Sequence, residues 1–238
     1  MTEFGEYIPL FRIDHILYIC ILMISALWMY KEKKFIKKYE KGFTVILFIV
    51  SLVQQILLYG SYFILFEFDL GESLPLHISR INSILIMAFL LTKNRKLYAV
   101  ICYFSLFAWL TFLYPSRVYG ITHPIGISFI INHVITLLFP YYARAAYPVE
   151  IKKGDKVFAY KWFLLYLFIV SIINPLVDGN YFYFKYKPIF PEMANYIYIP
   201  LVIVFVYLLF SLGEIIFKKI AKEWISGRNR KSFLTRKI

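Results

Sequence analysis

The sequence has little charge, and most of the charge that it has is positive. Asp and Glu account for 14 of the 238 residues and Lys and Arg for 27, so charged side chains make up only 17% of the chain. Hydrophobic side chains make up 61%. A soluble domain is about a quarter charged and near half apolar, so this composition excludes that class. The excess of apolar residues requires a surface in contact with lipid and predicts an integral membrane protein.

Cysteine and cofactor-binding motifs are also scarce. The chain has two Cys and four His, and it contains no phosphate-binding loop, no Cys/His set with metal-ligand spacing and no redox motif. Cys20 and Cys102 each lie inside an apolar run, which is typical of small core residues. We therefore expect no cofactor.

Seven apolar stretches approach the roughly 20 residues that a helix needs to cross a bilayer. They are residues 13–30, 43–63, 77–92, 97–113, 124–142, 162–176 and 196–217. The sequence therefore predicts an all-α membrane protein, a bundle of seven transmembrane helices that lies in the cell membrane as a multi-pass protein.

The basic residues sort to one side of these stretches. Of the 27 Lys and Arg, 22 lie in the alternate connections 31–41, 93–96 and 144–161 and in the segment 218–238. Because positively charged loops stay in the cytoplasm, we expect the N-terminus outside and the C-terminus inside. Basic segments at a membrane attract anionic headgroups, so membrane lipids are the expected partners and nucleic acid is not.

This topology divides the chain into three parts. Residues 1–12 form an extracellular N-terminal segment, residues 13–217 the transmembrane domain, and residues 218–238 a basic cytoplasmic tail.

The most polar stretch in the apolar part of the chain is a predicted helix start. Ser73 suits the N-cap and Pro75 the first turn, and the stretch then carries His77, Ser79, Arg80 and Asn82. Ionisable residues within a bilayer are costly and usually functional. On an ideal helix His77 and Ser79 point about 160° apart, so a histidine that pairs with Ser79 has to come from another helix.

A second polar cluster lies in the predicted span 124–142. Its members Ser128, Asn132, His133 and Thr136 fall within an arc of about 140° at 100° per residue. They can therefore face one interior cavity.

Most of the other polar groups inside the spans lie toward the same, outer side, among them His15 and Asn174. We interpret this distribution as a functional cavity in the outer leaflet; the alternative is that these groups only pair with one another and fix helix packing. Gln54 and Gln55 lie at mid-depth and favour hydrogen bonds between helices.

The order of several short motifs resembles a known family. Leu-Pro-Leu-His at residues 74–77, Asn132-His133, Asn174-Pro175 and Gly-Asn-Tyr at residues 179–181 are similar to the bacterial YwaF-type integral membrane proteins. Their eukaryotic relative is the transmembrane protein 164 family. The resemblance runs from about Phe11 to Leu208. The eukaryotic relatives are similar to phospholipid acyltransferases that use a cysteine nucleophile and a histidine.

The resemblance implies roles for particular residues. It places the family's cysteine at Ser79, its aspartate at Arg80 and its later histidine at His133. Ser79 is then the nucleophile and His133 its general base. The expected substrate contacts are His15, His77, Arg80, Asn82, Asn132, Asn174, Asn180 and Tyr181.

Three classes of function remain open at this point. The first is acyl transfer or ester hydrolysis on outer-leaflet phospholipids. The second is transport or binding of a small polar or anionic solute near Arg80, and the third is a non-catalytic structural membrane subunit. A metal held by His15, His77 and His133 together with Asp14 is a further alternative, since these residue types suffice as ligands.

Overall fold

The computed structural model describes residues 7–234, and it describes side chains as far as Lys219. Within this part of the chain the structure is helical, apart from an isolated bridge between Tyr7 and Tyr119. The helices are α1 (Ile13–Lys31), α2 (Lys33–Lys38), α3 (Glu40–Leu65), α4 (Leu70–Ser73), α5 (Ile78–Thr92), α6 (Arg95–Leu113), α7 (Pro124–Ala146), α8 (Asp155–Val177), the 3-10 turn η1 (Tyr181–Tyr183) and α9 (Asn195–Leu234).

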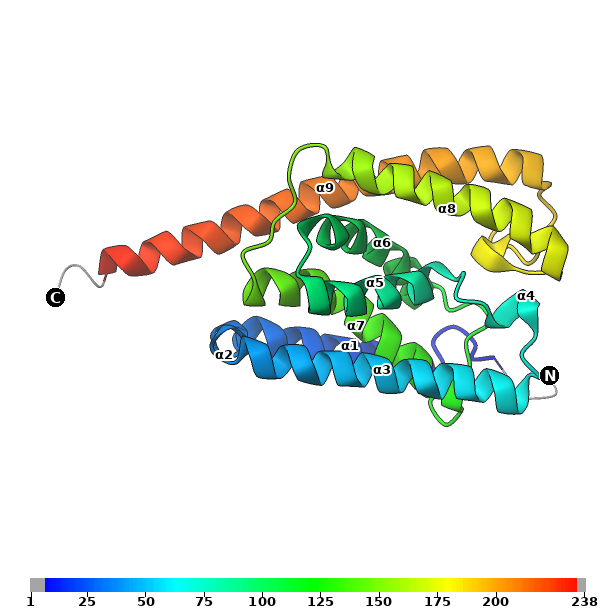
Figure 1. Ribbon diagram of the computed structural model, residues 1–238, viewed down its shortest axis with the longest axis horizontal. Helices are drawn as coiled ribbons and strands as arrows, with labels where there is room; N and C mark the ends of the chain where they lie inside the picture. The colour runs from blue at the N-terminus through cyan, green and yellow to red at the C-terminus, as the bar shows by residue number, and fades with distance from the viewer. Residues whose placement is uncertain (1–6, 235–238) are drawn as a thin grey trace.

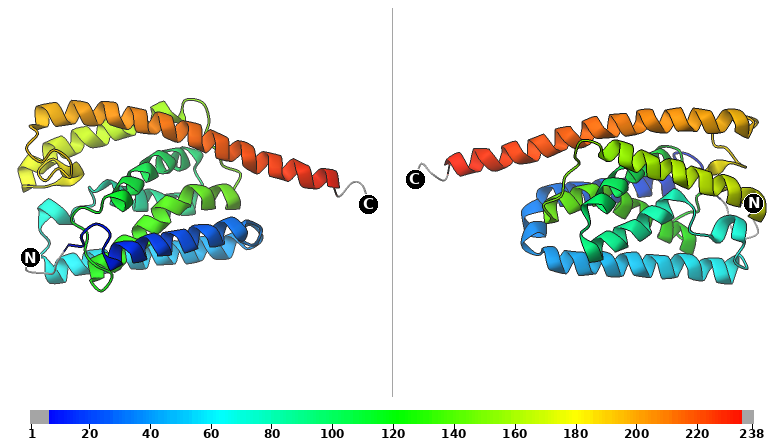
Figure 2. Two further views of the ribbon diagram at one scale, coloured as in Figure 1. Left: turned by 180° about the vertical axis from the view of Figure 1, so that it is seen from behind. Right: turned by 45° about the horizontal axis from the view of Figure 1, so that its top comes forward.

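The helices form three layers. Helices α1 and α3 make one outer layer, α5, α6 and α7 the middle layer, and α8 and α9 the other outer layer (Figures 1 and 2). The middle layer packs on both of the others, with α7 against α1 and α3 and α6 against α8 and α9. Helix α6 is the most enclosed, with Ile101, Cys102 and Tyr103 fully buried.

Six of the helices are long and apolar enough to cross a membrane: α1, α3, α6, α7, α8 and α9 through Lys219. Large hydrophobic side chains cover the outward faces of these helices, as in Ile64 and Leu176, which are 81% and 76% exposed. Such faces are stable against lipid rather than water. The chain is therefore a polytopic membrane protein. Each of the seven stretches predicted from the sequence falls on a helix, but the helix in the third, α5, has only 15 residues.

Helix α5 does not start where the sequence predicts. Ser73 ends the short helix α4, and the N-cap of α5 is His77, which has an extended backbone. The cause is Pro75, because the residue before a proline is disfavoured in the helical region, and Leu74 accordingly has ψ 153°. The prediction of Ser73 as the N-cap was therefore wrong.

Helix α9 is longer than the predicted span 196–217. It continues without a break to Leu234 and extends beyond the rest of the bundle (Figure 1). The proposed basic tail is therefore a continuation of the last helix as far as Leu234, and residues 235–238 lie outside the described part of the chain.

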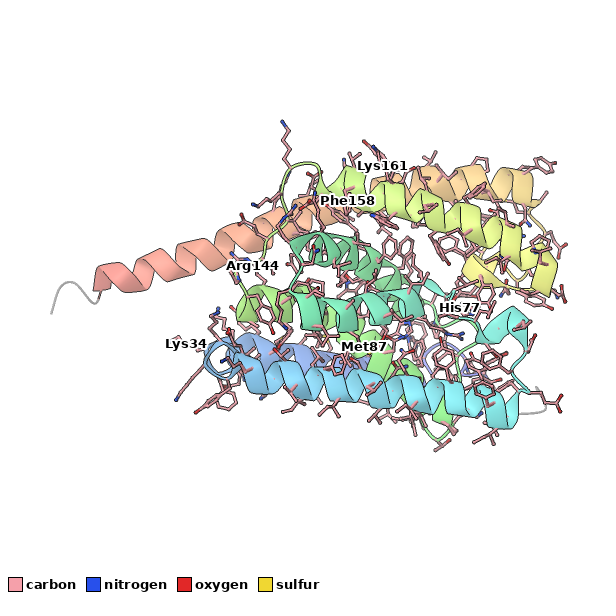
Figure 3. All side chains as sticks on the ribbon, viewed as in Figure 1. Lys34, His77, Met87, Arg144, Phe158 and Lys161 are labelled. Carbon is pink, nitrogen blue, oxygen red and sulfur yellow. The ribbon has the colours of Figure 1, made fainter. Side chains whose placement is uncertain are left out.

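The two ends of the bundle differ in charge. Lys34 and Arg144 lie at one end, the Lys34 end, and His77 lies toward the other, the His77 end (Figure 3). At the Lys34 end the buried carboxylate of Asp155 accepts a hydrogen bond from Arg95 Nη1 at 2.5 Å and another from the Lys152 backbone at 2.7 Å. This carboxylate joins the α5–α6 turn to the α7–α8 loop.

Candidate functional site

A cavity of about 920 Å³ lies at the His77 end of the bundle. Its wall is built from α3, α5, α6, α7 and α9 and from the loops at that end of the helices. It brings together most of the polar residues that the sequence singles out. Of the predicted site residues, those that line it are His77, Ser79, Arg80, Asn132, His133 and Asn180.

The loop between α4 and α5 brings Ser79 to this wall, and a buried tyrosine holds the loop in place. Tyr181 Oη donates to the Leu70 carbonyl at 2.6 Å and accepts from the Leu74 amide at 2.9 Å. Asn174 fixes Tyr181 in turn, with Nδ2 donating to the Tyr181 carbonyl at 2.8 Å and Oδ1 accepting from its amide at 2.9 Å. Asn174 and Tyr181, both predicted to contact substrate, thus use these groups to build the loop, and neither is among the described residues that line the cavity.

Arg80 lies on the cavity wall but is largely occupied by the protein. Its Nη1 donates to the carbonyls of Glu72 at 2.5 Å and Leu74 at 3.0 Å, and its Nη2 donates to Tyr62 Oη. The guanidinium also lies over the Tyr62 ring, 4.8 Å from its centroid. Arg80 therefore ties α5 to α3 and to the loop that precedes α5.

A carboxylate beside Arg80 joins two loops. Glu72 Oε2 accepts a hydrogen bond from His77 Nε2 at 3.3 Å, and Glu72 Oε1 accepts one from Arg117 Nη2 at 3.2 Å. Burial alone raises the pKa of Glu72, but the hydrogen bond from His77, the charge that His77 carries when protonated, and the charges of Arg117 and Arg80 together outweigh burial and hold this pKa below its ordinary value of 4.5. Burial and the charge of Arg80 lower the pKa of His77 below 6.5. His77 is therefore neutral at pH 7 and donates to a charged Glu72.

We predict that the protein loses stability as the pH falls below about 6.5, the ordinary pKa of histidine. The unfolded chain takes up a proton on His77 at that pH, whereas the folded chain does so only at lower pH, so acid favours unfolding. The contribution of Glu72 is lost as the pH falls further, through its lowered pKa. Thermal unfolding in detergent at pH 7.5 and at 5.5 measures the slope. His77→Gln should flatten it between these values; an unchanged slope in this variant contradicts the assignment.

The predicted polar face of α7 is confirmed by the structure. Ser128, Asn132, His133 and Thr136 all line the cavity. Asn132 Nδ2 donates to the Ser79 carbonyl at 3.4 Å, and Asn132 Oδ1 accepts from Thr136 Oγ1 at 3.3 Å. The residue next to His133 thus lies directly against the start of α5.

His133 has a defined orientation. Its Nδ1 lies 2.9 Å from the Phe129 carbonyl, and its ring stacks on the Phe129 ring with centroids 3.9 Å apart. A carbonyl only accepts hydrogen bonds, so Nδ1 carries the proton in this contact. In the neutral imidazole the lone pair is then on Nε2, which is the atom that a general base needs. His133 is only 5% exposed, and it lines the same cavity as Ser79.

Two glutamines of α3 form hydrogen bonds with the neighbouring helices α7 and α5. Gln54 Nε2 donates to Ser128 Oγ at 2.8 Å, and Gln55 Nε2 donates to Ser83 Oγ at 3.0 Å. The prediction that this pair makes hydrogen bonds between helices is confirmed. Gln54 also lines the cavity.

Three further predicted residues have surroundings that the sequence does not reveal. The His15 ring is buried; its Nδ1 accepts from the Phe11 amide at 3.1 Å and its Nε2 contacts the Phe112 carbonyl at 2.7 Å. Asn82 is fully buried in α5, and neither His15 nor Asn82 is among the described residues that line the cavity. Asn180 lines it, but its Oδ1 accepts from two backbone amides of the following loop.

Sequence reasoning missed the roles of Glu72, Tyr62 and Arg117. Glu72 lies only five residues before His77, in an acidic segment, and this closeness in the sequence is a signal that the two side chains could pair. Nothing local in the sequence marks Tyr62 or Arg117, because each comes from a different helix or loop and meets Glu72 or Arg80 only in the fold.

The alternative of a metal held by the three histidines finds no support in the described residues. No three His, Cys, Asp or Glu side chains gather there as ligands. His15, His77 and His133 each have different partners, on α6, on α4 and on α7.

Comparison with known proteins gives one family. The sequence model of the TMEM164 family matches residues 10–214, which is most of the chain. No curated protein and no solved structure matches the chain.

Proposed function

From the premise that the chain belongs to the TMEM164 family, we propose that this membrane protein transfers or hydrolyses an acyl chain of a phospholipid. Ser79 is the nucleophile and His133 the general base. The observation that supports the proposal is that Ser79 and His133, from α5 and α7, line one cavity between helices that are apolar enough to lie in a membrane. The finer resemblance to the bacterial YwaF-type proteins, in which Ser79 takes the place of the cysteine, is part of the same proposal.

The chemistry needs two steps. Ser79 Oγ attacks the ester carbonyl while its proton passes to His133 Nε2, and the tetrahedral intermediate then collapses and releases the lysophospholipid with that proton. The acyl–Ser79 ester is next attacked by water in hydrolysis, or by the hydroxyl of a second lipid in transfer, with His133 again taking the proton. Ser79 is the second residue of α5, where unpaired amides and the positive end of the helix dipole favour a developing oxyanion.

Purified protein in vesicles that contain a phospholipid with a labelled acyl chain tests this function. We expect label to appear as free fatty acid or in a second lipid. If instead no lipid is turned over while a small anionic solute binds or crosses the membrane, the transport alternative takes its place. If neither occurs, the chain acts as a non-catalytic structural subunit.

We further propose that α5 is a seventh crossing. Its 15 residues span about 22 Å, less than the roughly 30 Å hydrocarbon core. The shortfall is tolerable because α5 packs against α3, α6 and α7, and non-helical backbone can lie at membrane depth where protein covers it. With α5 included, the N-terminus lies outside, the C-terminus inside, and the Lys34 end meets anionic headgroups of the cell membrane.

This topology predicts opposite sidedness for Lys34 and Lys185. Single cysteines at the two positions, in a chain that lacks Cys20 and Cys102, are exposed to a reagent that does not cross membranes. In intact cells we expect the position 185 cysteine to be labelled and the position 34 cysteine only after permeabilisation. Labelling of both positions in intact cells contradicts the seven-crossing topology.

A further inference from the structure

The cavity has an apolar part, which is formed by residues of α6 and α9. Its wall combines Phe104, Phe107 and Ala108 of α6 with Val202 and Phe205 of α9. We call these five residues and the space that they enclose the apolar arm. None of them carries a polar side chain, whereas the other side of the cavity holds Ser79, Asn132 and His133.

The apolar arm lies beside the contact between α6 and α9. In that contact a Cβ atom added to Gly213 would lie 2.5 Å from Leu106 Cδ1, and the rings of Tyr103 and Phe210 lie 5.0 Å apart. The α9 residues of the arm, Phe205 and Val202, come one to three turns closer to the His77 end, and there both helices line the cavity. On α9 the arm therefore lies between this contact and the His77 end.

The arm borders a surface suited to lipid. Val202 is 9% exposed and points into the arm, whereas its neighbours Leu201 and Phe205, which also line the cavity, are 52% and 48% exposed. These residues belong to the apolar part of α9, which is among the helices suited to cross a membrane. An opening at this place meets hydrocarbon rather than water.

We propose that the apolar arm binds one long hydrocarbon chain, which enters sideways from the membrane between α6 and α9 and ends with its carbonyl group near Ser79. Only the identity of the reacting end rests on the proposed function. A hydrocarbon chain is the ligand that an uncharged wall of aromatic and aliphatic side chains favours, because such a wall packs against methylene groups and offers a polar ligand no hydrogen-bonding partner. The continuity of the arm with the polar compartment places an ester at the boundary between them.

Photo-cross-linking in vesicles tests the arm without any need for catalysis. All variants carry Ser79→Ala, so that no probe is consumed. The probes are a phospholipid and a free fatty acid, each with a diazirine near the end of the acyl chain, and the cross-linked peptides are identified by mass spectrometry. We expect label on the segments of α6 and α9 that contain Phe104 and Val202. The probe that labels more strongly gives the source of the chain.

Val202→Trp fills the arm, and Val204→Trp is its matched control, because Val204 is on the same helix and 59% exposed. We expect the label on the arm to be lost in Val202→Trp protein, because the indole takes the space of the chain, and to be unchanged in Val204→Trp protein. Equal labelling in the two variants, or label that maps only to outward faces, overturns the proposal. Thermal unfolding verifies that both variants fold; if Val202→Trp does not, the smaller Ala108→Leu replaces it.

The outcomes separate this inference from the proposed function. Label in the arm that Val202→Trp removes, in a protein that turns over no lipid, supports the arm and contradicts the chemistry. Equal labelling of Val202→Trp and Val204→Trp in the Ser79→Ala background, together with lipid turnover of the same chain-length preference in the two variants that keep Ser79, supports the chemistry and overturns the arm.

Discussion

Replacing Ser79 by alanine is expected to lower phospholipid turnover on the order of 10³-fold or more, since it removes the atom that forms the acyl–enzyme ester. Ser79 lines the cavity, and the contact that fixes its place, from Asn132, is to its backbone carbonyl. The variant should therefore fold normally. Ser79→Cys should keep or raise turnover, because a thiolate is the better nucleophile. Release of label from a phospholipid in vesicles measures both.

Ser83→Ala is the matched control for Ser79→Ala. Ser83 is on the same helix and buried, but it accepts a hydrogen bond from Gln55 and is not among the described residues that line the cavity. Its loss should lower the free energy of unfolding by about 1 kcal/mol and leave turnover per folded molecule unchanged. Full activity of Ser79→Ala, or equal losses in the two variants, contradicts the assignment of Ser79.

The second large effect is expected at His133. His133→Gln keeps a polar side chain of similar length but removes the base, and a general base contributes typically 10²- to 10⁴-fold to the rate. The loss should appear in the rate at saturating lipid rather than in the lipid concentration for half-maximal rate, because the base acts in the chemical step. Initial rates over a range of lipid mole fractions in vesicles separate the two parameters.

His15→Gln is the matched control for His133→Gln. Both histidines are buried and contact a backbone carbonyl, but of the two only His133 is among the described residues that line the cavity. His15→Gln should reduce the melting temperature and leave turnover per folded molecule intact. Equal activity losses in the two variants would mean that His133 only supports the fold.

The sequence predicts the helices and the polar face of α7 well, because both depend on local composition and on the helical period. Ser128, Asn132, His133 and Thr136 needed only 100° per residue to be placed on one cavity. The basic segments 31–41, 93–96 and 144–161 likewise lie where one long helix ends and the next begins, and residues 218–234 lie in the last helix.

The loop before α5 shows where prediction from sequence ends. The sequence places a helix start at Ser73, a substrate contact at Arg80 and another at Tyr181. In the structure Tyr181 binds the carbonyl of Leu70, 111 residues away, and Arg80 binds the carbonyls of Glu72 and Leu74, eight and six residues away. Such contacts depend on the folded path of the chain, so a polar residue that supports the site and one that contacts substrate look alike in sequence.

Mass spectrometry of the protein quenched with acid during turnover tests the central claim most directly. The account predicts that a fraction of wild-type protein gains the mass of one acyl chain, that the added mass maps to the peptide containing Ser79, and that it is absent from Ser79→Ala. His133→Gln should form this ester much more slowly. An acyl group on another residue, or continued turnover of phospholipid by Ser79→Ala protein, contradicts the account.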